Sequence, residues 1–193
     1  LEQVLFSLYE DEGRKDLVRN LFEAFGYRRY YLKQLSKKGS PISLAAAADK
    51  LGRIGDPAAV DPLARLLNHK RSEVATVAFR ALCRIGTANA LNRALFSLPM
   101  LLKKSRITVK AVQTSLLLFG NWAIDRLLQY AGRAHDPEVL AVILETLVSF
   151  PARKEILDFA MARLSHPDPE VRGKALKLLA RGEKGAFSDE EVF

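Results

Sequence analysis

The sequence has few of the residues that build covalent or metal-bound frameworks. Its one cysteine, Cys83, excludes an intramolecular disulfide and a multi-cysteine zinc site within this chain. A single thiol fits a reducing compartment, and we expect Cys83 to be a half-buried helix residue. No run of about 18 apolar residues occurs, so the sequence predicts no membrane-spanning helix.

Familiar catalytic motifs are also absent. The chain contains no GxxxxGK[ST], GxGxxG, HExxH or GxSxG pattern. Its three histidines, His69, His135 and His166, each follow a first helix of a predicted pair. Stacked pairs would hold them about 10 Å apart, too far to share one tetrahedral ion. We therefore expect no metal, no cofactor and no enzymatic activity.

Positive charge is concentrated in the middle third of the chain. The sequence has 30 Lys and Arg against 22 Asp and Glu, for a net charge of +8. Residues 61–120 hold ten of the cations and only two of the acids. A local excess of this kind indicates a binding surface for an acidic partner.

Apolar blocks recur at the period of a helix-turn-helix repeat. The segment LGRIGDPAAVDPL, which begins at residue 51, recurs in similar form as LCRIGTANALNRAL about thirty residues later. Within 72–86 the apolar residues fall at helical spacing, without period-two alternation. The pattern predicts a stack of paired helices. Successive blocks end near Gly26, Gly55, Gly86, Gly120, Pro151 and Gly182.

Local signals predict where these helices begin and end. Asp56-Pro57 directly follows Gly55, so a helix-ending glycine precedes a helix-starting proline. A capping residue and a first-turn acid precede later second helices at Ser72-Glu73, Asp136-Pro137-Glu138 and Asp168-Pro169-Glu170. Gly182 and Gly185 predict the end of the last helix, followed by a tail or a capping helix from Ser188.

GDPAAVDPLARLL followed by SEVATVAFRALCRIG, and HPDPEVRGKALKLLARG near the end, resemble HEAT repeats of the short bacterial type also found in phycocyanobilin lyases. The resemblance implies an all-α, right-handed α-solenoid of five to six stacked helix-turn-helix repeats. We expect one solenoid domain over 1–193. It comprises an N-terminal cap and degenerate repeat (1–38), HEAT-like repeats (39–182) and a C-terminal tail or capping segment (183–193).

The resemblance also implies that the second helix of each unit lines a concave surface. There, Arg80 and Arg84 lie four residues apart with no nearby acid on their own helix. A second cluster, Lys103-Lys104-Ser105-Arg106, is expected in a turn between helices of adjacent units, and His69-Lys70-Arg71 in the equivalent turn one repeat earlier. Stacking would place both turns on one edge. The candidate binding residues are Arg53, Arg80, Arg84, Lys103, Lys104, Arg106 and Lys110; the alternative is a solvated face.

Two further stretches leave alternatives open. In YRRYYLKQLSKK the cations suit an anionic membrane surface or nucleic acid, or they face water while the tyrosines pack the first repeat, which we favour. These cations are Arg28, Arg29, Lys33, Lys37 and Lys38. Trp122 and Asp125 are similar to the aromatic and aspartate pair of HEAT-like alkylpurine DNA glycosylases, although a Trp packed between repeats is the interpretation that we favour.

We predict a non-enzymatic scaffold or adaptor that binds an acidic segment of a partner protein through the concave or edge surface of its basic middle repeats. The alternative is a nucleic-acid-binding protein, including an alkylpurine-type DNA glycosylase; a chromophore-lyase subunit rests on family analogy. We expect a cytoplasmic location. Because the chain begins at Leu1 rather than Met, membrane tethering through an upstream segment stays open.

Overall fold

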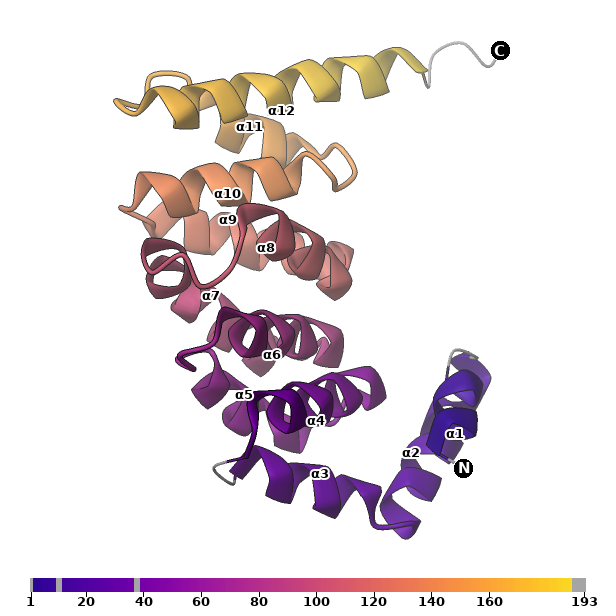
Figure 1. Ribbon diagram of the computed structural model, residues 1–193. Coiled ribbons are helices and arrows are strands. Elements are labelled where there is room, and N and C mark those ends of the chain that lie inside the picture. Colours follow the sequence, from indigo (N-terminus) through magenta and orange to yellow (C-terminus); the bar gives the residue numbers. More distant parts are fainter. Residues whose placement is uncertain (1, 10–11, 37–38, 189–193) are drawn as a thin grey trace.

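The computed structural model is a stack of paired helices (Figure 1). It describes residues 2–9, 12–36 and 39–188; the side chains of residues 12 and 183–188 lie outside that description. The described residues form α-helices and short 3-10 helices, and none of them forms a strand. The prediction of an all-α solenoid is therefore confirmed.

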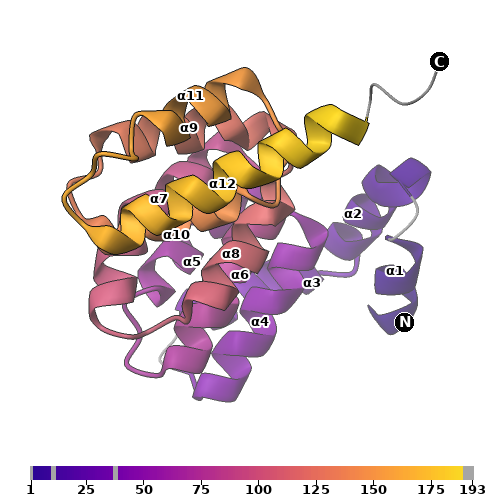
Figure 2. The same ribbon diagram turned by 90° about the horizontal axis from the view of Figure 1, so that it is seen from above.

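The described residues form five helix pairs, each with a first and a second helix. The pairs lie one on another along the stack (Figures 1 and 2). The first helices are α3 (Tyr27–Ser36), α5 (Val60–Leu66), α7 (Ala88–Lys103), α9 (Ile124–Arg133) and α11 (Lys154–Met161). The second helices are α4 (Pro41–Ile54), α6 (Ser72–Ile85), α8 (Val109–Leu116), α10 (Pro137–Leu147) and α12 (Pro169–Ser188). Each second helix contacts the second helix of the next pair, so together they form one layer.

Most of the predicted helix ends are seen in the structure. Gly55 and Gly86 adopt left-handed φ angles of 67° and 71° at the ends of α4 and α6. The carboxylates of Asp56, Asp136 and Asp168 each accept a hydrogen bond from a backbone N–H two residues on. The capping role expected for Ser72-Glu73 is wrong, because α6 begins at Ser72 itself and its N-cap residue provides no side-chain bond.

The buried side chains form a continuous core along the stack. It includes Phe22, Leu51, Phe79, Leu98 and Leu127, which come from five different helices. Cys83 belongs to this core and is fully buried rather than half-buried. Loss of hydration raises the pKa of its thiol well above the ordinary value.

A glycine allows the closest approach between the first two second helices. Gly52 lies inside α4, and a Cβ atom added there would be 2.6 Å from both the Cα and the Cβ of Ala81 in α6. Real Cβ atoms do not approach neighbours this closely, so α4 and α6 pack at a distance that only glycine permits. Close helix packing, rather than the conformational freedom of a glycine backbone, explains why residue 52 is a glycine.

The same reasoning corrects the predicted end of the last helix. α12 continues through Gly182 and Gly185 to Ser188, so neither glycine ends it. An added Cβ at Gly182 would be 2.5 Å from Leu157 Cδ2 of α11. The absence of a side chain at Gly182 leaves room for the Leu157 side chain of α11 against α12. The expected capping helix from Ser188 falls mainly in residues 189–193, outside the described residues.

An N-terminal hairpin of α1 (Glu2–Leu8) and α2 (Lys15–Ala24) stands beside the stack instead of extending it (Figure 1). The Glu2 carboxylate lies 2.6 Å from Lys50 Nζ and accepts a hydrogen bond from the Tyr31 hydroxyl. The Tyr9 hydroxyl donates to the carbonyl oxygen of Ile54, the last residue of α4. These contacts fix the hairpin to the C-terminal end of α4.

We predict that Gly52→Ala destabilises the protein by about 1–3 kcal/mol, the usual cost of overpacking a core. Gly132→Ala and Gly173→Ala are matched controls in α9 and α12, because nothing lies within 4 Å of a Cβ added at either position. They should be neutral or stabilising by up to about 1 kcal/mol. Urea unfolding measures all three; equal midpoints for Gly52→Ala and the controls would contradict the packing explanation.

Candidate functional site

The two basic turns lie side by side. Residues 67–71 connect α5 to α6, and residues 104–108 connect α7 to α8. Each turn therefore joins the two helices of one pair, which corrects the expected position of Lys103–Arg106 between adjacent units. The Arg106 guanidinium donates a hydrogen bond to the backbone carbonyl oxygen of His69, so it ties one turn directly to the next.

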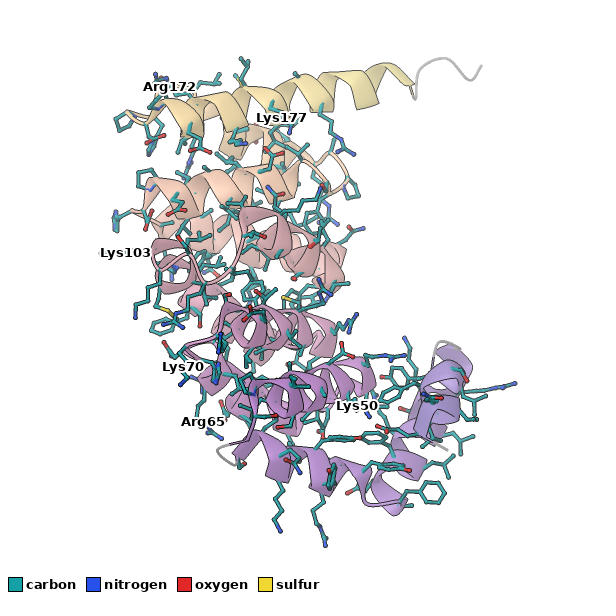
Figure 3. All side chains as sticks on the ribbon, in the orientation of Figure 1. Lys50, Arg65, Lys70, Lys103, Arg172 and Lys177 are labelled. Carbon is teal, nitrogen blue, oxygen red and sulfur yellow. The ribbon has the colours of Figure 1, made fainter. Side chains whose placement is uncertain are left out.

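Exposed cations gather around these two turns, and we call them the basic edge. Figure 3 shows Arg65, Lys70 and Lys103 following one another along the same side of the stack. The members of the basic edge are Arg65, Lys70, Arg71, Lys103, Lys104 and Lys110. All six are exposed, and within the part of the chain that the structure describes their side chains make no hydrogen bond or ion pair.

Few acids offset this charge. The second helices α6, α10 and α12 carry Glu73, Glu138 and Glu170 in their first turns, whereas α8 has no acid there and carries Lys110 instead. The first turn of a helix already favours negative charge, because its backbone N–H groups point outward. The edge is thus most positive at the α7–α8 turn and becomes balanced toward α12.

The other candidate cations lie elsewhere on the second-helix layer. Arg84 Nη1 is 2.6 Å from Asp49 Oδ1 of α4, so its charge is already compensated within the fold. The Arg53 guanidinium lies over the Phe6 ring, 4.3 Å from its centroid. Arg80 is exposed and has no hydrogen-bond or ion-pair partner among the described residues. The two arginines of the predicted patch therefore differ: Arg84 is paired with an acid of the fold, and Arg80 is not.

The seven candidate residues consequently separate into two groups. Arg53 and Arg84 are next to last in α4 and α6, whereas Lys110 is second in α8 and Lys103 and Lys104 lie at the end of α7. Sequence reasoning missed Asp49 because it considered acids on the same helix only.

Two lysines in the C-terminal half of the second-helix layer pair with an acid of the neighbouring second helix. Glu145 of α10 forms ion pairs with Lys174, at 3.0 Å, and with Lys177 of α12. Burial disfavours the Glu145 charge, but hydrogen bonds from the two lysines outweigh this effect, and the pKa of Glu145 is lowered. The lysines here are structural partners, unlike those of the basic edge.

The tyrosine-rich helix α3 divides between core and surface. Tyr27 and Tyr31 pack against Phe22 with centroids 5.4 and 6.0 Å apart, whereas Tyr30 is exposed. Arg28 is bound by Asp56 and Glu23, each at 2.9 Å, and the bond to Asp56 raises its pKa. Of the membrane-facing candidates, Arg29 and Lys33 are exposed, and Lys37 and Lys38 lie outside the described residues.

The described helices include none that is both long and apolar enough to cross a membrane. The described residues also contain no group of three or more His, Cys, Asp or Glu side chains arranged to hold a metal. His69 and His166 have the same local role, because each Nδ1 accepts a hydrogen bond from the backbone N–H two residues on. These two rings therefore stabilise the turns of their repeats.

Trp122 and Asp125 lie on the first-helix layer, at the start of α9, and not among the second helices. Trp122 is 46% exposed and packs edge-to-face on Phe119 at 5.8 Å. The expected burial between repeats is only partly seen. This placement differs from the groove on the second helices that the resemblance to glycosylases requires.

Comparison with known proteins agrees with this architecture. A family model described as HEAT repeats matches residues 30–116, which cover most of α3 and continue to the end of α8. No curated protein matches the chain. The match supports the repeat type and does not extend to the phycocyanobilin-lyase subtype. It includes both turns of the basic edge.

We predict different costs for the two arginines of α6. Arg84→Glu places a second carboxylate beside Asp49 and should lower the free energy of unfolding by about 0.5–1 kcal/mol, since both groups are partly exposed. Arg80→Glu should change it by less than about 0.5 kcal/mol. Urea unfolding at low salt tests this difference; a larger loss for Arg80→Glu would contradict the assigned ion pair.

Proposed function

We propose that this chain, whose residues 30–116 match the HEAT-repeat family model, is a non-enzymatic scaffold whose basic edge binds an acidic segment of a partner protein. HEAT repeats generally act as protein-interaction scaffolds. Their stacked helices bury one continuous core and leave an extended surface whose side chains are free to vary. The proposal goes beyond this general role in two respects: it names the basic edge as the binding surface, and it states that the bound segment is acidic.

The observation that carries this proposal is the absence of internal partners for the edge cations. Six exposed Lys and Arg side chains lie around two adjoining turns, and no carboxylate among the described residues pairs with them. Elsewhere the fold pairs some second-helix cations with acids, as Arg84 and Lys174 show, although Arg80 has no such partner among the described residues. The unpaired set therefore suits an external acidic group, which would gain charge-assisted hydrogen bonds.

A protein partner is favoured over single-stranded nucleic acid by the kind of residue present. Proteins that bind single strands combine a positive groove with aromatic side chains on which bases stack. The two turns of the basic edge, 67–71 and 104–108, contain no Phe, Tyr or Trp. A flexible acidic peptide needs no stacking platform and can follow the turns through ion pairs.

We predict that a glutamate-rich peptide binds the protein and that Lys70→Gln, Lys103→Gln, Lys104→Gln together weaken it about tenfold. This corresponds to roughly 0.5 kcal/mol for each exposed ion pair. Arg106 is left unchanged because it ties the two turns together. The matched control changes three exposed cations outside the edge, Lys33, Lys154 and Arg133, to Gln.

Fluorescence anisotropy with a labelled peptide measures both affinities, with circular dichroism to confirm that each variant is folded. Unchanged binding by the edge variant, or equal weakening in the control, would contradict the proposal. If a DNA or RNA oligonucleotide binds more tightly than the peptide, and the edge variant loses that binding, the ligand of the basic edge is nucleic acid and the proposal is wrong.

A further inference from the structure

A second candidate site lies on the first-helix layer, between α7 and α9. A cavity of about 290 Å³ opens there, and all of its lining residues come from these two helices. No residue of the basic edge lines it, so the two surfaces are separate. The polar and aromatic lining residues are Asn92, Phe96, Arg126, Gln129, Tyr130 and Arg133.

Helical spacing brings these side chains together in two rows. Asn92 and Phe96 are four residues apart in α7, so they lie on one face of that helix. In α9 the same spacing aligns Arg126 with Tyr130, and Arg133 follows about one turn later. The cavity is therefore lined by an aromatic ring from each helix and by guanidinium groups from α9.

Phe96 presents an aromatic ring to solvent. It is 84% exposed, the largest exposed fraction of any large apolar residue in the part of the chain that the structure describes. Leu95 and Leu98 of the same helix are buried, so the exposure of Phe96 does not come from a loosely packed α7. A planar group that covers this ring removes apolar surface from water and stacks on an aromatic face. Phe96 is thus suited to be a stacking platform.

The groups beside this ring are cationic or neutral and have no internal partner. The stretch from residue 88 to residue 133 has a single acid, Asp125, which does not line the cavity. Asn92, Arg126, Gln129 and Arg133 are exposed, and their side chains make no hydrogen bond or ion pair with any described residue. Their donors and acceptors are available to a ligand.

One acid moderates the charge at the C-terminal end of α9. Burial and, second, the charge of Asp136 raise the pKa of the Tyr130 hydroxyl, so this carboxylate lies near that end of the cavity. Asp136 already caps α10, because it accepts a hydrogen bond from the Glu138 N–H. We therefore assign an anionic group of the ligand to Arg126, at the other end of α9.

We infer that this cavity binds a nucleotide, with its base on Phe96 and its phosphate at Arg126. A base stacked on an aromatic ring and a phosphate held by an arginine fork are the two contacts that this arrangement offers. The carboxamides of Asn92 and Gln129 add paired donors and acceptors of the kind that bind adenine at N6 and N7. A free nucleotide and a nucleotide of a single-stranded nucleic acid present the same base and phosphate.

Isothermal titration calorimetry with AMP tests this inference, in a phosphate-free buffer of low salt at neutral pH. The parent protein should show saturable binding of one equivalent. Phe96→Ala should weaken it about tenfold, because the stacking face is lost. Arg126→Gln should weaken it about fivefold, because the charge-assisted bonds to phosphate are lost.

Two matched controls remove the same residue types outside the cavity. Phe25→Ala removes an exposed phenyl ring at the end of α2, and Arg80→Gln removes an exposed arginine of α6. Both should leave AMP binding unchanged. Circular dichroism shows whether each variant folds; if Phe96→Ala does not, Phe96→Leu keeps an apolar side chain and should still weaken binding several-fold.

The inference is overturned by any of three results. These are no saturable binding of AMP by the parent, unchanged affinity in the folded Phe96 variant, and equal affinity for ribose 5-phosphate, which has the phosphate but no base. Affinity for an eight-residue oligoadenylate at least tenfold above that for AMP assigns the cavity to single-stranded nucleic acid, and comparable affinity assigns it to a free nucleotide. Both of these outcomes support a nucleotide site.

The test is independent of the basic edge. The edge variant, with Lys70, Lys103 and Lys104 changed to Gln, should bind AMP as the parent does, since none of the three lines this cavity. Loss of AMP binding in that variant would contradict the placement of the nucleotide between α7 and α9. Failure of AMP to bind leaves the proposal for the basic edge unchanged.

Discussion

Close packing between successive second helices is the constraint on which the rest of the molecule depends. It is tightest where Gly52 of α4 meets Ala81 of α6. Helices packed in this way align the turns that precede them, so residues thirty or more positions apart come to lie next to each other. The bond from Arg106 to the His69 carbonyl oxygen is a direct result of that alignment. The basic edge exists only because the stack exists.

The stack also determines which charges stay available. Two cations of the second-helix layer face neighbouring helices that supply acids: Arg84 pairs with Asp49, and Lys174 pairs with Glu145. Cations in turns face solvent on most sides and meet no such neighbour. A partner therefore gains most by approaching the turns, where its carboxylates replace water rather than an existing ion pair.

Much of the architecture could be predicted from the sequence, because its signals are local. Gly55 and Gly86 end helices with left-handed backbones, and Asp136 and Asp168 cap helix starts as their positions indicate. Contacts between pairs were harder to anticipate. Asp49 and Arg84 form an ion pair from two different helices, so no pattern within either helix predicts it.

The remaining errors have the same origin. Gly182 was expected to end a helix, yet it lies inside α12 and gives room to Leu157 of α11. A glycine that provides close packing and one that ends a helix look alike in a sequence. The α1–α2 hairpin contacts α4 through Glu2, Tyr9 and Arg19, and the repeat pattern of the sequence does not predict these contacts.

Amide hydrogen exchange with and without a saturating glutamate-rich peptide tests the central claim most directly, namely that stacking joins two turns into one acidic-segment site. The account predicts slower exchange in both segments, 67–72 and 103–110, with little change in α9 and α11. Slower exchange in one turn alone, or confined to helices away from both turns, would contradict it.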